Sequence, residues 1–134
     1  MKFYSQFGQD KWLYENFFKD TKNGVFLEIG ADDGIDKSNT LFFEESLDWT
    51  GICVEPSLER FKLLQNNRKC ICENVALSNN VGEVEFLDIK GYGKGLSGIL
   101  EDYCEQHKHR IYQECQNEKN RGREVIKVKT DLLN

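Results

Sequence analysis

The sequence predicts an α/β fold in which parallel central strands alternate with helices, arranged as one domain over residues 1–134. Two short apolar runs, 25–29 and 52–54, are rich in strand-forming residues, and a segment of helical periodicity follows each of them. The first run enters a turn that contains two glycines, and the second ends at Glu55, which a proline follows. Because strand–helix–strand crossovers within one sheet are right-handed, we expect these strands to pair in parallel.

In the first half of the chain, the helices are predicted from periodicity and from their start signals. Apolar residues at helical spacing predict a short amphipathic helix over 10–18. The polar run 38–40 precedes an apolar cluster and predicts a capped helix start. Ser57 predicts a second cap, before a helix that turns Leu64 inward.

In the second half, the pattern of the chain changes. The apolar alternation over 70–77 predicts a third strand, and the segment 79–82 predicts a hairpin turn before a strand around Phe86. A stripe of apolar residues predicts a helix over 99–117. The segment 124–129 alternates apolar and charged residues, which predicts an edge or hairpin strand.

Composition narrows the class of protein. The net charge is −5 and the basic residues form no single block, so no nucleic-acid partner is expected. The apolar runs are far too short to cross a membrane, and the N-terminal residues lack the apolar core of a secretory signal. We therefore expect a cytoplasmic protein without a membrane partner.

The chain has five cysteines: Cys53, Cys70, Cys72, Cys104 and Cys115. Their number is odd and they form no C-x-x-C pair, so the spacing predicts neither a disulfide framework nor a metal site. Cys70 and Cys72 alternate in a predicted strand and should face the same side of it. Free thiols, mostly buried, in a reducing compartment are the expectation.

The glycine turn and the acid after the second strand carry the strongest chemical signal. In open α/β sheets, ligands bind outside the carboxyl ends of the strands, and Glu55 could accept hydrogen bonds there from both hydroxyls of a ribose. The spacing Gly30-x-x-x-Gly34 departs from the G-x-G-x-x-G fingerprint of NAD-binding domains. The two aspartates inside the turn would repel a pyrophosphate but suit an amino group and a sulfonium centre, which favours S-adenosylmethionine over NAD. The alternative to a ligand site is a purely structural turn, with Glu55 as an ordinary acid on the surface.

Four ordered motifs resemble the FkbM family of methyltransferases: YSQFGQD at 4–10, FLEIGADDG at 26–34, SNT at 38–40 and WTGICVEP at 49–56. The segment NVALS at 74–78 continues the match, so the resemblance covers most of residues 4 to 98. Asp32 stands where the family commonly has asparagine, a mild departure. The resemblance implies a Rossmann-like class I methyltransferase fold, S-adenosylmethionine as methyl donor and, often, a hydroxyl group as acceptor.

The resemblance also implies a set of cofactor contacts. Residues of the first turn would surround the methionine part of the cofactor, namely Glu28, Gly30 and Gly34, together with Ala31 and Asp33. Glu55, followed by Pro56, would hold the ribose. The segment Asn74, Val75 and Ala76 would lie near the adenine. An equally good interpretation is that Asn74 is only a polar residue at the end of a strand, without a ligand contact.

Three further positions have a structural and a functional interpretation. Gln9 and Asp10 could close over the cofactor from the N-terminal side, or they could simply begin a helix with a favourable first-turn acid. Asn39, with its two neighbours, could contact the ligand or only cap the helix. His107 is expected to be a packed histidine, and Lys94 lies in a loop, so no catalytic base is assigned.

Taken as a member of this family, the chain is expected to be a methyltransferase that O-methylates a small molecule or a glycan. The alternatives are a non-catalytic nucleotide-binding or interaction module of the same fold and an NAD-binding Rossmann domain. The resemblance implies a further helix and strand after 128–134, so the fold is expected to be incomplete at its C-terminus. An uncovered sheet edge beside the first strand would then invite self-association.

Overall fold

The computed structural model of the chain describes residues 1–115 and 122–134. They form two compact units, Met1–Val75 and Ala76–Asn134, each of which is described here by itself. The expectation of one domain over the whole chain stays a prediction. None of the helices in these ranges combines the length and the apolar character that crossing a bilayer requires.

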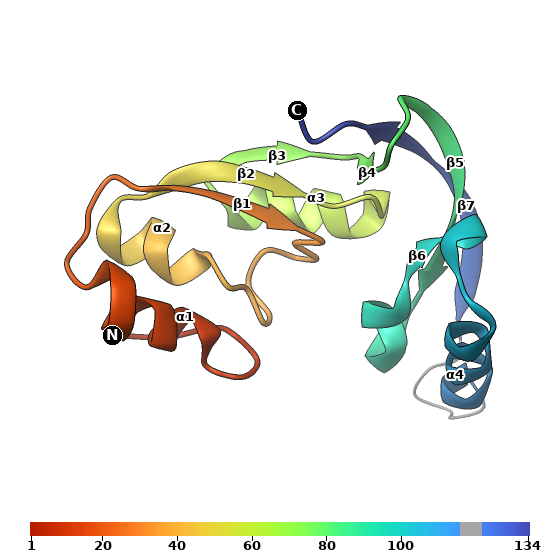
Figure 1. Cartoon of the computed structure of the whole chain (residues 1–134), viewed down its shortest axis with the longest axis horizontal. Coiled ribbons are helices and arrows are strands. Elements are labelled where there is room, and N and C mark those ends of the chain that lie inside the picture. Colours follow the sequence, from red (N-terminus) through yellow and green to blue (C-terminus); the bar gives the residue numbers. More distant parts are fainter. Residues whose placement is uncertain (116–121) are drawn as a thin grey trace. The chain divides into compact units, whose positions relative to one another are not determined.

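The first unit contains a parallel sheet of three strands in the order β1-β2-β3 (Figure 1). Its strands are β1 Val25–Ile29, β2 Thr50–Val54 and β3 Ile71–Glu73. Leu27 pairs with Ile52, and Ile52 pairs with Ile71. The parallel pairing of the strands, predicted from their alternation with helices, is confirmed.

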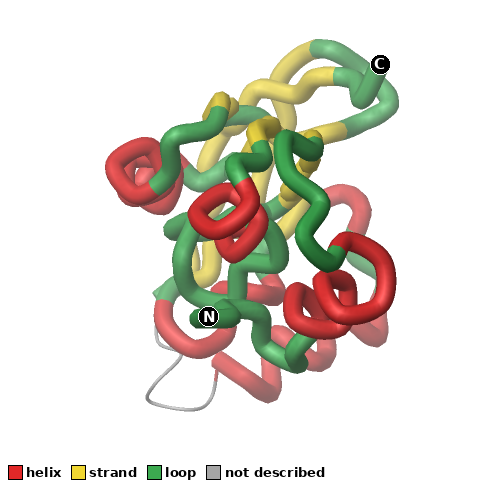
Figure 2. Tube along the Cα trace, turned by 90° about the vertical axis from the view of Figure 1, so that its left-hand side faces the viewer, coloured by secondary structure: helices red, strands yellow, loops and turns green. Residues whose placement is uncertain are grey.

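In chain order, one helical segment precedes β1, and one helix lies in each of the two connections between the strands. Figure 2 distinguishes helices from strands along the Cα trace. The helices of this unit are α1 Gln9–Leu13, which continues into a π-helical segment Tyr14–Phe18, α2 Leu41–Leu47 and α3 Leu58–Asn67. The predicted helix over 10–18 is therefore present in two parts. Both later helices begin where the sequence predicts, although Ser57 occupies its N-cap position without a side-chain cap hydrogen bond.

Two apolar clusters hold the first unit together. Aromatic side chains form one of them, centred on Tyr14, Phe42 and Phe43. Phe26 and Cys53, which point from neighbouring strands to the same side of the sheet, form the other with residues that include Ala31 and Leu64. The helices thus cover the face of the sheet to which these two strand residues point.

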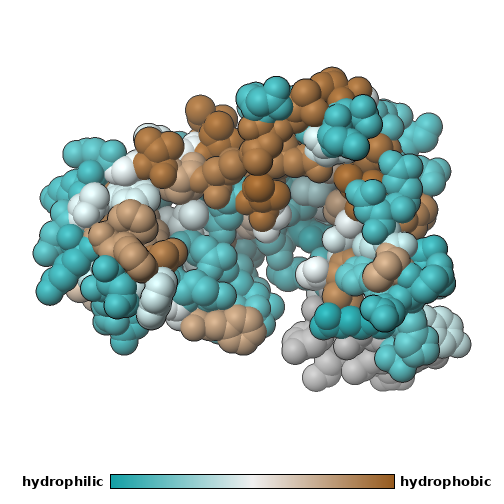
Figure 3. Space-filling model, in the orientation of Figure 1, coloured by the Kyte–Doolittle hydropathy of each residue, from teal (hydrophilic) through white to brown (hydrophobic). Residues whose placement is uncertain are grey.

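The other face of this sheet is exposed. Val25, Leu27 and Ile29 alternate with the two buried residues of β1, and their exposed fractions are 75%, 44% and 57%. Ile52 and Ile71 continue the apolar surface across the neighbouring strands. Figure 3 shows apolar side chains gathered over these strands. β1 is therefore covered on one face only, although a nearly unbroken apolar run is typical of a strand that is buried on both faces.

The second unit contains a curled mixed sheet of four strands in the order β4-β7-β5-β6. The strands are β4 Ala76–Leu77, β5 Gly82–Ile89, β6 Gly98–Ile99 and β7 Arg123–Asp131. Two 3-10 segments, Gly91–Leu96 and Leu100–Asp102, and the helix α4 Glu105–Cys115 complete it. Ile111 of α4 packs with Leu87 and Ile89 of β5 in a small core.

The predicted strand over 70–77 is wrong as a single element, because β3 and β4 belong to different sheets. The ladder between β2 and β3 ends with the hydrogen bond from the Glu55 N–H to the Glu73 carbonyl. The next N–H on this side of the chain, that of Ser57, donates to the Glu55 carboxylate, so the ladder does not continue. Asn74 instead donates its side-chain amide to the Glu55 and Pro56 carbonyls at 2.8 and 3.0 Å.

Two expectations for the second half are also wrong. The segment 79–82 does not join two neighbouring strands, because β7 lies between β4 and β5. β7 is for the same reason an inner strand of this sheet rather than an edge, and it pairs with β5 along eight residues from Gly82 to Ile89. The alternation of β7 correctly predicted that Val128 would be buried and its lysine neighbours exposed, but alternation specifies faces and not neighbours.

The helix predicted over 99–117 is shorter than expected. Ile99 pairs with Phe86 in the sheet, and α4 begins only at Glu105. The strand pairing of Ile99 holds this residue in an extended conformation, so the helix cannot include it. The last two residues of the predicted helix, 116–117, lie outside the described residues.

Candidate functional site

The carboxyl end of β1 enters a tight turn that is attached to β2. The N–H groups of Gly30 and Ala31 both donate to the Val54 carbonyl, at 2.9 and 3.0 Å. Gly30, Asp32 and Gly34 all have positive φ, at 72°, 54° and 83°. Because this left-handed backbone suits glycine best, the sequence around the turn directly determines its shape.

The two glycines of the turn are needed for different reasons. A Cβ atom added to Gly30 would meet no atom within 4 Å, so one side of its backbone is open. A Cβ atom added to Gly34 would lie 2.7 Å from side-chain carbons of both Leu64 and Arg68. Gly30 therefore leaves room for a ligand to approach, whereas Gly34 is required by packing against α3 and the residue that follows it.

Glu55 connects the end of β2 to this turn. The residue is only 2% exposed, and its carboxylate accepts the Asp32 N–H at 2.8 Å and the Ser57 N–H at 2.9 Å, one on each oxygen. Burial raises the pKa of Glu55, and the two backbone hydrogen bonds only partly oppose this effect. The carboxylate is thus held in a fixed position between the turn and the start of α3.

Asn74 holds the segment that carries Glu55, through the two side-chain hydrogen bonds to the Glu55 and Pro56 carbonyls described above. Asn74 and Val75 are half-buried residues of the first unit. Ala76 is buried in the second unit, where it begins β4. The structure therefore shows a structural task for the Asn74 amide, and the expected contact of 74–76 with adenine stays a prediction.

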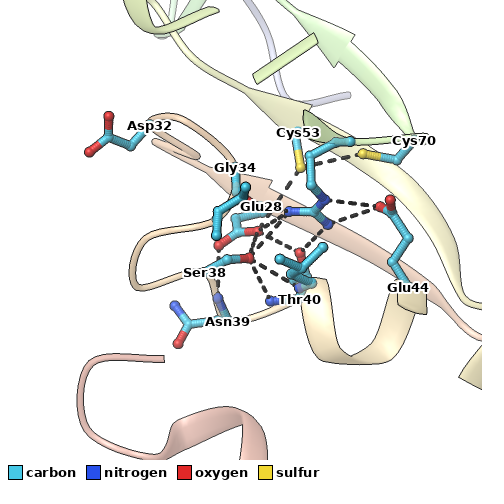
Figure 4. Close-up of polar contacts among 12 residues, drawn as sticks. Glu28, Asp32, Gly34, Ser38, Asn39, Thr40, Glu44, Cys53 and Cys70 are labelled. Carbon is cyan, nitrogen blue, oxygen red and sulfur yellow. Dashed lines mark hydrogen bonds and ion pairs between the residues drawn. The ribbon is translucent and has the colours of Figure 1, made fainter. Parts of the chain in front are cut away.

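Glu28 accepts hydrogen bonds from the loop before α2 (Figure 4). Its oxygens accept the Ser38 hydroxyl at 2.9 Å, the Asn39 N–H at 2.9 Å and the Thr40 hydroxyl. Arg68 adds a fourth hydrogen bond and an ion pair at 3.1 Å. Three of these hydrogen bonds fall on Oε2 and one on Oε1, so most of the acceptor capacity of this carboxylate is used inside the protein and anchors the loop 38–40.

Arg68 holds the elements of the candidate site together, and the sequence analysis did not identify it. The guanidinium of this buried residue bridges Glu28 and Glu44, with the second ion pair at 3.0 Å, and donates to the Gly34 carbonyl at 3.2 Å. A buried acid in a strand does signal that a cationic partner is required. The sequence offers 18 lysines and arginines, however, and no local pattern distinguishes this one.

The loop before α2 is shaped by Ser38, whose hydroxyl accepts the Thr40 and Leu41 N–H groups at 3.2 and 3.1 Å. Asn39 is exposed, and its side chain points away from the Glu28 cluster in Figure 4. Asp33 accepts the Ile35 and Asp36 N–H groups on one oxygen, both at 2.9 Å, and so closes the glycine turn. Ser38 therefore accepts N–H groups at the start of α2, although the N-cap residue is Thr40, which makes no side-chain cap hydrogen bond, and a ligand contact of Asn39 stays a prediction.

A family model, the methyltransferase FkbM domain, matches residues 28–131 of the chain. The chain belongs to the FkbM methyltransferase family. No curated protein and no solved structure matches it at a comparable level. The match begins at Glu28 and reaches into β7, so the FkbM domain includes the glycine turn, Glu55 and most of the second unit.

The N-terminal residues lie before the part of the chain that matches the FkbM domain. Asp10 is fully buried and accepts the Tyr4 N–H at 2.6 Å, the Ser5 hydroxyl at 2.6 Å and the Lys11 N–H at 2.8 Å. Burial alone would raise the pKa of Asp10, but these hydrogen bonds lower it. Gln9 accepts the Phe7 N–H at 2.9 Å. Both residues therefore shape the N-terminal loop and the start of α1.

This N-terminal loop lies beside the segment that follows the glycine turn of the FkbM domain, because Ser5 forms a parallel bridge with Lys37.

In the second unit, His107 packs against Tyr103 with ring centroids 4.6 Å apart and lies 3.3 Å from the Leu96 carbonyl, as expected of a packed histidine. His109 is exposed. Among the described residues, no group of three or more acids, histidines or cysteines is placed to hold a metal ion.

Proposed function

We propose that this FkbM-family chain binds S-adenosylmethionine at the carboxyl ends of β1 and β2 and transfers its methyl group to a hydroxyl of a small molecule or a glycan. The observation that carries the proposal is the pairing of an open glycine turn with a buried acid. Gly30 has free space where a side chain would stand, and Glu55 is fixed beside the same turn through the Asp32 N–H. A Rossmann-like class I fold, in which ligands bind at this end of the sheet, is part of the proposal.

The chemistry of Glu55 fits the ribose of the cofactor. Each of its oxygens accepts one backbone N–H, and each keeps acceptor capacity for a second donor. Two neighbouring ribose hydroxyls would supply those donors. Because the backbone bonds already fix the carboxylate, little conformational entropy would be lost when the ribose binds.

The contacts of Glu28 and Arg68 assign them a different role in the proposal. The Glu28 carboxylate is used by the loop 38–40 and by Arg68, so we infer that it positions the turn instead of touching the methionine part directly. Arg68 also holds the glycine turn, because its guanidinium donates a hydrogen bond to the Gly34 carbonyl. Both are positioning residues in this proposal.

An NAD-binding site is less compatible with this geometry. In dinucleotide folds the pyrophosphate rests on the N-terminus of the helix that directly follows the glycine turn. Here α2 begins only at Leu41, and the Ser38 hydroxyl accepts the N–H groups of Thr40 and Leu41. Asp33 also places a carboxyl group inside the turn. These features support S-adenosylmethionine as the ligand.

When bound, S-adenosylmethionine supplies an electrophilic methyl group on a sulfonium centre. The chain's own contribution would be to hold the donor in line with the acceptor, which is a large part of what methyl transfer requires. A hydroxyl acceptor also needs a base to remove its proton, and we assign none.

Calorimetry tests donor binding with S-adenosylhomocysteine and NAD as probes. We expect binding of the former only. Replacing Glu55 by alanine removes hydrogen bonds to a charged group and should weaken binding by about 1.5–3 kcal/mol, roughly 10- to 150-fold. Glu15→Ala, which removes an exposed acid that pairs with Lys11 on the surface, is the matched control. Binding of NAD in preference to S-adenosylhomocysteine would overturn the proposal.

Once donor binding is established, a methyl-transfer assay distinguishes the enzyme from a non-catalytic module of the same fold. A panel of hydroxylated small molecules and glycans is incubated with radiolabelled donor. Transfer to a hydroxyl that disappears in Glu55→Ala supports the enzyme. Tight donor binding without transfer to any member of a broad panel would favour the non-catalytic module.

A further inference from the structure

Three cysteines gather on the buried face of the first sheet. Cys53 of β2 and Cys72 of β3 are register partners on neighbouring strands. Cys70, two residues before Cys72, turns its side chain to the same face, as its alternation predicted, and its sulfur lies 3.5 Å from that of Cys53 (Figure 4). All of these thiols are free.

The two sulfurs of the close pair differ in their access to solvent. Cys53 is fully buried, whereas Cys70 is half-buried. Cys70 also lines a pocket of about 570 Å³ at the end of the sheet where β2 begins, together with residues that include Glu44 and Trp49. A small reagent can therefore reach Cys70 from the pocket, while Cys53 lies behind it.

The surroundings of the pair favour a thiolate at the accessible position. The hydrogen bond shared with Cys53 lowers the pKa of Cys70, and the charge of Arg68 acts in the same direction, against burial and the charge of Glu44. The same hydrogen bond and burial raise the pKa of Cys53. These shifts favour Cys70, the sulfur that solvent reaches, as the attacking thiolate.

We propose that Cys70 and Cys53 form an oxidation site, at which hydrogen peroxide reacts with Cys70 and Cys53 then closes a disulfide. The pair stands 3.5 Å apart before reaction, and a disulfide requires about 2.05 Å between the sulfurs, so the side chains must approach by about 1.5 Å. Cys53 lies in β2 and Cys70 directly precedes the neighbouring strand β3, so this approach is a local movement.

The chemistry balances in two steps. The Cys70 thiolate attacks one peroxide oxygen, an S–O bond forms, the O–O bond breaks, and the leaving hydroxide takes up a proton to become water. The sulfur of Cys53 then attacks the Cys70 sulfenic acid, an S–S bond forms, the S–O bond breaks, and hydroxide leaves with the Cys53 proton as a second water. Two thiols are oxidised and one peroxide is reduced to two waters.

Oxidation of this pair would disturb the Glu28–Arg68 ion pair, which holds the glycine turn in place. The Cys53 sulfur lies 4.0 Å from the Glu28 carboxylate, and the charge of Arg68 acts on both thiols. Moving Cys53 toward Cys70 therefore alters the packing around the Glu28–Arg68 pair. The oxidation site itself does not depend on the proposed methyltransferase function, and its test needs no cofactor.

The test uses the full chain with Cys104 and Cys115 replaced by serine, so that only the three clustered thiols remain. The protein is treated with hydrogen peroxide, alkylated, digested with trypsin and analysed by mass spectrometry. Cleavage after Lys37, Arg60, Lys69 and Lys90 places Cys53 in peptide 38–60 and both other cysteines in peptide 70–90. We expect a cross-linked pair of these peptides that is lost on reduction.

Single variants identify the partner. The cross-link should persist in Cys72→Ser and disappear in Cys70→Ser, which changes a half-buried residue and should fold. In Cys53→Ala the sulfenic acid of Cys70 should accumulate and be trapped by dimedone on peptide 70–90. A cross-link that persists in Cys70→Ser and disappears in Cys72→Ser would overturn the assignment, as would peroxide-treated protein in which all three thiols are still alkylated.

Discussion

Arg68 and Glu28, 40 residues apart in the chain, form a buried ion pair in which the guanidinium Nη1 lies 3.1 Å from a carboxylate oxygen. The same guanidinium reaches Glu44 at 3.0 Å and lies over the Phe26 ring at 5.3 Å from its centroid. This arrangement joins the strand before the glycine turn, the helix after it and the end of α3. The shape of the candidate site therefore depends on a residue that is not itself at the site.

Removing the Arg68 charge should destabilise the protein strongly, because Glu28 would stay buried without its cationic partner. We expect Arg68→Met to lower the free energy of unfolding by about 3–5 kcal/mol in urea denaturation. Arg68→Lys should recover only part of this, since an ammonium cannot reproduce the planar fork of donors. Lys69→Met, at the adjacent exposed position, is the control and should change little. A loss below about 1 kcal/mol for Arg68→Met would contradict the anchoring role.

The glycines should separate into two classes when each is replaced by alanine. Gly8→Ala and Gly30→Ala introduce a left-handed alanine into open space, at φ of 77° and 72°, and should each cost about 1 kcal/mol of stability. Gly34→Ala adds a steric conflict with Leu64 and Arg68, and should cost about 2–4 kcal/mol. Thermal unfolding of the three variants gives the comparison. Equal losses at the three positions would show that the conflict at Gly34 is relieved without cost.

The stability of the protein should carry a pH dependence from Glu55. Its folded-state pKa is raised above the ordinary value near 4.5, so the folded protein holds this proton more tightly than the unfolded chain. The stabilisation is present below pH 4.5 and is lost as the pH rises through the raised pKa, above which the curve is flat. Subtracting the unfolding free energy of Glu55→Gln at each pH isolates this contribution. A difference that does not change with pH would mean that burial does not perturb Glu55.

The exposed face and free edge of β1 should promote self-association of the chain. β1 has one neighbour in its sheet among the described residues, and its outward side chains are apolar. A second copy could pair with this edge, which an exposed apolar strand invites. Light scattering over a concentration series should show the molar mass rising. Val25→Lys should reduce the effect, whereas Val81→Lys, at a similar exposed fraction of 70%, should not. A strictly monomeric wild-type chain would refute this prediction.

The sequence by itself determined those features that depend on local patterns. The apolar runs of β1 and β2, the glycine turn after the first and Glu55 at the end of the second follow from short-range propensity and from the left-handed backbone that Gly30 permits. The starts of α2 and α3 were likewise visible, because helix starts depend on only a few adjacent residues.

Only the tertiary structure decided which distant segments meet. β7 lies between β4 and β5, and β3 separates from β4, although the alternation of their residues is equally compatible with other neighbours. Arg68 became the partner of Glu28 because the C-terminal end of α3 lies against the loop 34–40, a relation that no spacing in the chain encodes. Hydrogen bonds and ion pairs between remote residues depend on how whole elements pack together, so local sequence does not identify the partners.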